Sequence, residues 1–203
     1  EVCSFDAIVN SHGIPMFASG NITPDSLMDV VNNAGNCRYY IVKDLADDVR
    51  AAGMAAVKSF EVKSRFIHFE FFRLTQDQPG LGKKGALVGL EVNMRPPGGI
   101  TPELLNYANS TNVYKVGADM IALDRSTQAA GKRCFCVFAG RRDGKDFLLS
   151  HEEVLEKYAA HLKIVDRVPD ALSACMANQM YVATFSTQRE LDRFYKDLFA
   201  CKA

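Results

Sequence analysis

The sequence has no excess of either charge, because 24 lysine and arginine residues balance 24 aspartate and glutamate residues. It also lacks a basic run interleaved with aromatic residues, which is the pattern typical of nucleic-acid binding. Its longest apolar runs, such as the one around residues 86–90, are far too short to span a bilayer. With 48% hydrophobic and 24% charged residues, we expect a cytoplasmic globular protein that binds neither nucleic acid nor membrane.

A CxxC pair is also missing among the six cysteines. Without a second pair of ligands at a suitable spacing, a cysteine metal site is not expected. Reduced thiols in a cytosolic core are the favoured interpretation. The chain has no initiating methionine and no targeting segment, and it opens directly on the strand pattern EVCSFDAIVN. We therefore expect a fragment of a longer polypeptide.

Hydrophobic periodicity predicts strands and helices in alternating groups. Strands are predicted at residues 2–9, 14–18, 65–74, 86–95, 132–140 and 181–186. Helices are predicted after caps at Asp44, Thr101, Ser150 and Thr187, and over residues 113–124, while residues 19–36 are predicted to be loop with one short helix. The helix after Ser150 is expected to run through VLEKYAAHL, to residue 162. The class is α+β, with a mostly antiparallel sheet flanked by helices.

The stretch LEVNMRPPGG, residues 90–99, indicates a functional site. On a strand, alternate side chains point to opposite faces, so Glu91, Asn93 and Arg95 share one face. Leu90, Val92 and Met94 would share the other, core-facing side. The double proline that follows ends the strand, because proline cannot donate to the ladder.

The preceding strand, RFIHFEFF, carries His68, Glu70 and Phe72 on one face. If it pairs antiparallel with the LEVNMR strand, Glu70 faces the same space as Glu91 and Asn93. Two carboxylates and an amide oxygen are hard ligands suited to Mg²⁺. The alternative is a solvated polar face of the sheet, with His68 a hydrogen-bonded strand histidine.

FIHFEFF followed by a loop and GLEVNMRPPGG resembles the metal-binding strands of the ATP-grasp superfamily, most closely its biotin-carboxylase-like and carbamoyl-phosphate-synthetase-like members. The resemblance covers residues 1–125, and implies the C-terminal lobe of an ATP-grasp domain, with residues 126–203 as a small α/β C-terminal extension. The family's glycine-rich phosphate loop and nucleotide-contacting lysines would lie upstream of this chain.

The resemblance implies a role for each matched residue. Glu70 would be the first metal ligand, Glu91 would bridge two Mg²⁺ ions, and Asn93 would hold one of them. Arg95 would steady the reacting phosphoryl or acyl group. For nucleotide binding, the resemblance implies that Phe72 is the apolar residue that lies under the adenine. It also implies that Asp6, in the opening strand pair, points inward towards the nucleotide site.

The implied function is an ATP- and Mg²⁺-dependent ligase. Such an enzyme activates a carboxylate as an acyl phosphate, which a nucleophile such as an amine then attacks; the fragment alone is expected to be inactive. A biotin-carboxylase-like enzyme acting on bicarbonate and a non-catalytic nucleotide-binding scaffold are the alternatives. The oligomeric state stays open, with a homodimer as one option. In the last third, Arg141 and Arg142 are expected to be solvated in a hairpin turn.

Overall fold

The computed structural model describes residues 1–202, which form two compact units. Unit 1 contains residues 1–23 and 41–133; unit 2 contains residues 24–40 and the chain from residue 134 onward. The sequence places a boundary between residues 125 and 126, and it does not predict that residues 24–40 belong with the C-terminal unit. Each unit is a mostly antiparallel sheet with helices, which is the predicted α+β class.

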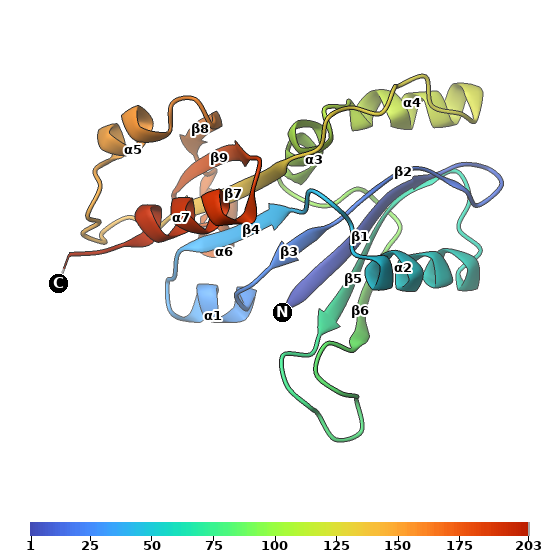
Figure 1. The fold of residues 1–203 in the computed structure, drawn as a ribbon, viewed down its shortest axis with the longest axis horizontal. Helices are drawn as coiled ribbons and strands as arrows, with labels where there is room; N and C mark the ends of the chain where they lie inside the picture. The colour runs from blue at the N-terminus through green and yellow to red at the C-terminus, as the bar shows by residue number, and fades with distance from the viewer. Residues whose placement is uncertain (203) are drawn as a thin grey trace. The chain divides into compact units, whose positions relative to one another are not determined.

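Unit 1 holds the two strands of interest. Its strands are β1 (Val2–Val9), β2 (Pro15–Ser19), β3 (Asn21–Thr23), β5 (Arg65–Arg73) and β6 (Leu87–Asn93), and its helices are α2 (Asp47–Ser59), α3 (Thr101–Asn109) and α4 (Val113–Leu123) (Figure 1). β1 pairs antiparallel with β2, β3 and β5, and β6 pairs antiparallel with β5. β6 is thus the edge strand next to β5.

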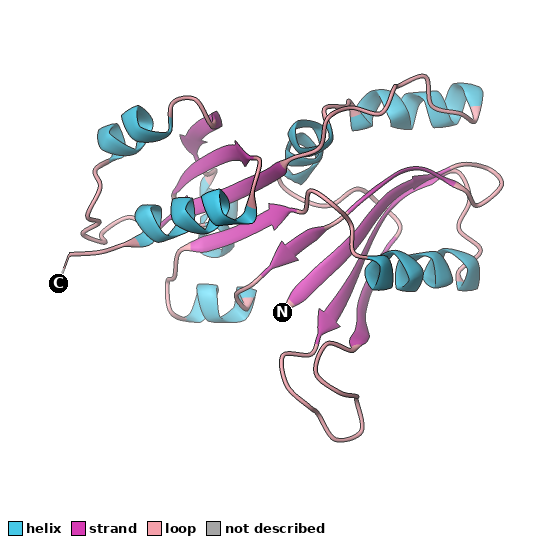
Figure 2. Ribbon diagram, viewed as in Figure 1, coloured by secondary structure: helices cyan, strands magenta, loops and turns pink. Residues whose placement is uncertain are grey.

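The core of unit 1 lies between one face of this sheet and α2, which Figure 2 shows running beside the strands. Phe5 and Phe69 are fully buried there. α2 comes this close because it has a glycine where it meets Phe5: a Cβ built on Gly53 would lie 2.2 Å from the Phe5 ring. α4 contacts β1, β2 and β5.

In unit 2, helices α5 and α7 pack on a second core that is rich in aromatic residues. Its helices are α1 (Leu27–Asn32), α5 (His151–Tyr158), α6 (Asp170–Met176) and α7 (Gln188–Phe199), and its strands are β7 (Phe135–Arg141), β8 (Leu162–Arg167), β9 (Gln179–Phe185) and β4 (Cys37–Ile41), whose last residue belongs to unit 1. β9 lies between β7 and β8 and is antiparallel to both. Capping boxes at Ser150 and Thr187 start α5 and α7 as predicted.

Several local predictions were wrong. Asp44 does not cap α2: the helix begins after Ala46, which has no side-chain cap, and its first turn instead carries two aspartates that favour the positive helix end. Thr101 lies inside α3, after the cap position Ile100. α5 ends at Tyr158, residues 159–161 form a turn, and Leu162 begins β8.

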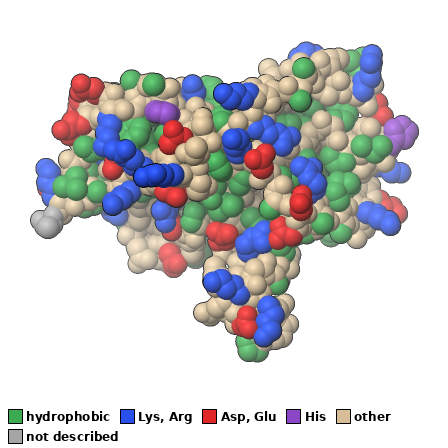
Figure 3. All heavy atoms as spheres, in the orientation of Figure 1, with side chains coloured by type: hydrophobic (Ala, Val, Ile, Leu, Met, Phe, Trp, Pro, Cys, Tyr) green, Lys and Arg blue, Asp and Glu red, His purple; other side chains and the backbone are tan. Residues whose placement is uncertain are grey.

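Acidic and basic side chains mix over the visible surface (Figure 3), in keeping with their equal numbers. Cys3, Cys37 and Cys136 are free cysteines and are buried. Among the described residues, no helix combines the length and apolar character that crossing a bilayer requires.

Candidate functional site: facing carboxylates on β5 and β6

The two faces of the β1–β5 pair differ sharply in chemistry. Phe5 and Phe69 point into the apolar core against α2. Because side chains alternate along a strand, Asp6, His68 and Glu70 lie on the opposite face. One polar row therefore runs across the strands, with the core directly beneath it.

The predicted antiparallel pairing of β5 with β6 is confirmed and brings the expected residues together. Glu70 pairs with Glu91, and His68 pairs with Asn93, so all four side chains share the polar face. The register shifts between Glu70 and Phe71, which is a β-bulge. Bulges bend a strand and redirect its side chains, and they recur next to functional sites.

His68 is clamped between two carboxylates. Its Nδ1 lies 2.6 Å from Oδ1 of Asp6, and its Nε2 lies 3.5 Å from Oε1 of Glu70. Burial alone would lower the pKa of His68, but the hydrogen bonds to Asp6 and Glu70 outweigh it and raise this pKa to about 10. At neutral pH His68 is therefore a buried imidazolium.

Asp6 is completely buried, and it is satisfied inside the protein. The Ser4 hydroxyl donates to Oδ2 of Asp6, and the same hydroxyl oxygen accepts from the backbone N–H of Asn21 at 2.9 Å. The geometry thus makes Asp6 the anchor of His68. The sequence pattern placed Asp6 inward but did not reveal this Ser4–Asp6–His68 network, because its members come from strands about 60 residues apart.

The imidazolium has a direct effect on Glu70. The hydrogen bond from His68 lowers the pKa of Glu70, and the positive charges of His68 and Arg95 contribute in the same direction. Glu70 is thus held ionised at neutral pH. Its neighbour Glu91 is exposed, so the pair is open to a ligand on the Glu91 side.

The side-chain amide of Asn93 bears on whether a cation fits beside Glu70 and Glu91. Its Nδ2 is buried and has no hydrogen-bond partner, and such an orphaned polar atom calls for an explanation. A half-turn of the amide would bring Oδ1 to this position as a third oxygen beside Glu70 and Glu91. Within residues 1–202 no three His, Cys, Asp or Glu side chains are placed to hold a metal.

Two further predicted residues lie beside this group. Arg95 follows the end of β6, is exposed, and donates to the carbonyl of Pro96 at 2.8 Å. Phe72 is 43% exposed, next along the polar face from Glu70. The expected core side of β6 is wrong in part: Met94 packs on the core, but Leu90 and Val92 are 45% and 41% exposed, because β6 is an edge strand.

Comparison with solved structures identifies the fold. No protein-family model and no curated protein matches the sequence. L-amino acid ligase from Bacillus licheniformis aligns with a TM-score of 0.64 and 15% identity, over 97% of this chain and 49% of that chain. Phosphoribosylglycinamide synthetase from Anaerococcus prevotii aligns with a TM-score of 0.60 and 11% identity, over 97% of this chain and 52% of that chain. Biotin carboxylase from Campylobacter jejuni aligns with a TM-score of 0.53 and 11% identity, over 99% of this chain and 45% of that chain.

The chain has the fold of the C-terminal part of ATP-grasp enzymes. It spans about half the length of each of these matched chains. At this level of sequence identity, the comparisons establish the fold of the chain, and its chemistry depends on the residues of the polar face.

Proposed function

We propose that this chain is the C-terminal part of an ATP- and Mg²⁺-dependent ligase that activates a carboxylate as an acyl phosphate for attack by an amine. The observation that carries the proposal is the cross-strand pairing of Glu70 with Glu91, beside Asn93 and on an ATP-grasp fold.

The charges on the polar face support a cation site. Like charges directly opposite each other on paired strands are destabilising. His68 offsets one of them, but it is already shared with Asp6. A second positive charge on the open side of the pair, where Glu91 is exposed, would balance the site. Oxygen ligands favour Mg²⁺, which takes them at about 2.0–2.1 Å.

In this proposal each residue has a limited task. Glu70, Glu91 and Asn93 would hold magnesium, which supplies charge neutralisation for phosphoryl transfer when bound with ATP. Asp6 and His68 fix the orientation and the charge of Glu70. Exposed Arg95, at the end of the row, would bind the negatively charged acyl or phosphoryl group, since a guanidinium matches such oxygens.

Bicarbonate is the alternative acid. A biotin carboxylase domain with 9% identity and a TM-score of 0.53, solved bound to bicarbonate, shares this fold. The same Glu70, Glu91, Asn93 and Arg95 would serve either acid. Stimulation of ATP hydrolysis by bicarbonate alone would favour this alternative, and stimulation that requires an amine together with an organic acid would favour the ligase.

The first experiment is a magnesium titration of the 203-residue chain by calorimetry, with and without ADP. Glu91→Gln removes a proposed ligand charge with little change of shape, so we expect magnesium binding to be lost or weakened at least tenfold. Glu156→Gln is the matched control, because Glu156 is an exposed glutamate on α5 of unit 2. Equal magnesium binding by the parent chain and Glu91→Gln would contradict the metal site.

The second experiment uses a protein that also carries the upstream half present in the matched enzymes. There, Glu91→Ala is expected to abolish magnesium-dependent ATP turnover, while Glu156→Ala retains it. Retained turnover in Glu91→Ala would overturn the proposed function. Magnesium binding without any turnover in the parent protein would instead identify a non-catalytic nucleotide-binding scaffold.

A further inference from the structure

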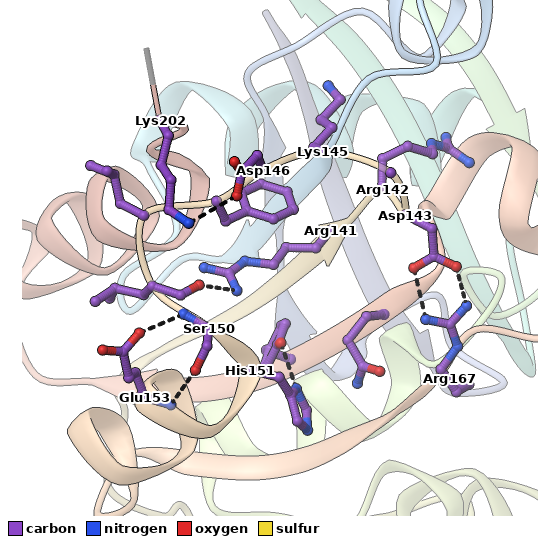
Figure 4. A pocket seen from close by; sticks show the side chains of 16 residues that line it. Arg141, Arg142, Asp143, Lys145, Asp146, Ser150, His151, Glu153, Arg167 and Lys202 are labelled. Carbon is purple, nitrogen blue, oxygen red and sulfur yellow. Dashed lines mark hydrogen bonds and ion pairs between the residues drawn. The ribbon is translucent and has the colours of Figure 1, made fainter.

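Unit 2 contains a cavity of about 440 Å³ at the end of β7 (Figure 4). The segment of residues 141–151 forms much of its wall, and Arg167, Tyr181 and Lys202 complete it. None of these residues belongs to unit 1, which carries the carboxylate site.

Arg141 lies in this cavity and is not the solvated turn residue that the sequence predicts. It ends β7 and is only 5% exposed. Its Nε donates to the carbonyl of Leu198 at 2.8 Å, and its Nη1 donates to the carbonyl of Leu149 at 2.9 Å. Its Nη2 is buried and has no hydrogen-bond partner. Arg142 is also held by carbonyl oxygens, including that of Ser173.

The acidic residues around the cavity do not neutralise Arg141. Figure 4 shows each of them bound elsewhere. Asp143 pairs with Arg167, and Asp146 pairs with Lys202 at 3.1 Å. The Glu153 carboxylate accepts from the backbone N–H of Ser150 at 2.7 Å within the capping box of α5.

Arg141 therefore carries a buried charge whose hydrogen-bond partners, the carbonyl oxygens of Leu149 and Leu198 and the Tyr181 side chain, are all uncharged. Burial lowers its pKa, yet a guanidinium stays charged at any pH at which the protein is folded. The Phe147 ring lies 4.3 Å from the guanidinium carbon and attracts the cation, but it supplies no countercharge. A buried charge without a counter-ion is destabilising, and a bound anion would relieve that.

The position of Phe147 over the Arg141 guanidinium is fixed by the segment that carries it. Its segment is tied to the C-terminal residues by two backbone hydrogen bonds, from Leu148 to Ala200 and from Lys202 to Asp146, each 2.8 Å.

We propose that this cavity binds a phosphate group, with Nη2 of Arg141 as its central donor. Five basic residues line the cavity against three acidic ones, a net of two positive charges that suits a phosphate dianion. The phosphate can belong to free inorganic phosphate or to a small phosphate monoester. This second anion site goes beyond the ligase chemistry proposed for unit 1, and either proposal can fail without the other.

The test is calorimetric titration of the 203-residue chain with inorganic phosphate and, separately, with glycerol phosphate, at an ionic strength held constant with chloride. We expect saturable binding that Arg141→Gln weakens at least tenfold. Arg193→Gln is the control, because it removes the same charge from an arginine of unit 2 whose side chain is 75% exposed. Tighter binding of the monoester would identify a metabolite site, and equal binding a site for the free ion.

A measurement on the unaltered protein guards against misfolding of Arg141→Gln, which also loses the bonds to Leu149 and Leu198. In ¹⁵N NMR spectra, phosphate should shift the amide signals of Gly144, Phe147 and Ser150 in a saturable way and leave that of Gly89 in unit 1 unchanged. Absence of such shifts, or shifts that chloride reproduces, would overturn the proposal. Equal weakening by Arg193→Gln would overturn it too.

Discussion

Glu70 on β5 and Glu91 on β6 lie directly opposite each other in an antiparallel strand pair. Cross-strand neighbours of like charge reduce stability, and the Ser4–Asp6–His68 network beneath Glu70 keeps that carboxylate ionised. The protein thus maintains a charge arrangement that costs stability in the absence of a cation. We attribute the arrangement to the magnesium site proposed above.

Glu91→Gln should therefore stabilise the metal-free protein. Removing one of two facing charges is expected to raise the free energy of unfolding by about 0.2–1 kcal/mol. Magnesium should stabilise the parent chain by mass action but leave Glu91→Gln unchanged. Urea unfolding in EDTA and in excess magnesium measures both effects. Glu156→Gln should show neither, and a Glu91→Gln protein that is less stable in EDTA would contradict the repulsion.

Two helical glycines give a matched pair of stability predictions. A Cβ on Gly53 would lie 2.2 Å from the Phe5 ring, so Gly53→Ala must displace a core ring and should cost about 1–3 kcal/mol. Gly117 in α4 has no atom within 4 Å of its built Cβ, so Gly117→Ala should gain about 0.5–1 kcal/mol from helix propensity. Thermal unfolding of both variants checks this, and equal effects would contradict the close packing of α2 on β1.

The strands of the candidate site are readable from sequence because their patterns are local. The strand RFIHFEFF and the segment LEVNMR both show period-two alternation, and the turn-rich residues between them indicate an antiparallel hairpin. Given that pairing, alternation places Glu70 on the same face as Glu91, but their exact register, which shifts between Glu70 and Phe71, does not follow from the pattern. The exposure of Leu90 and Val92 does not follow, because the sequence does not show that β6 lies at an edge.

Other features depend on contacts between distant segments. β4 and β8 are short and lack clear alternation, and they are defined by the strands beside them. The burial of Arg141 depends on carbonyls of Leu149 and Leu198, which no local pattern connects with an arginine after a strand. The clamp on His68 similarly requires β1 to lie beside β5.

Phe72 offers a test of the nucleotide side of the site. In a protein that carries the upstream half, Phe72→Ala should raise the KM for ATP about tenfold with little change in kcat, since an adenine contact of about 1.5 kcal/mol contributes equally to the ground and transition states. Because Phe72 is 43% exposed, the protein should still fold. Leu81→Ala is the control, because Leu81 is an apolar residue of unit 1 that is also exposed, at 60%. An unchanged KM in Phe72→Ala would remove this residue from the nucleotide site.

His68 should make stability depend on pH in the alkaline range. Its pKa is about 10 in the folded protein against an ordinary value of 6.5, so the folded state binds the proton more tightly. The stabilisation is fully present below pH 6.5 and is lost as the pH rises towards about 10. His68→Asn leaves Asp6 buried without its cation, and it should cost about 3–5 kcal/mol at pH 6 and much less at pH 10. Denaturant unfolding across this range measures the difference, with exposed His12→Asn as the control. A cost of His68→Asn that is the same at both pH values would show that His68 is not the imidazolium on which the charge of Glu70 depends.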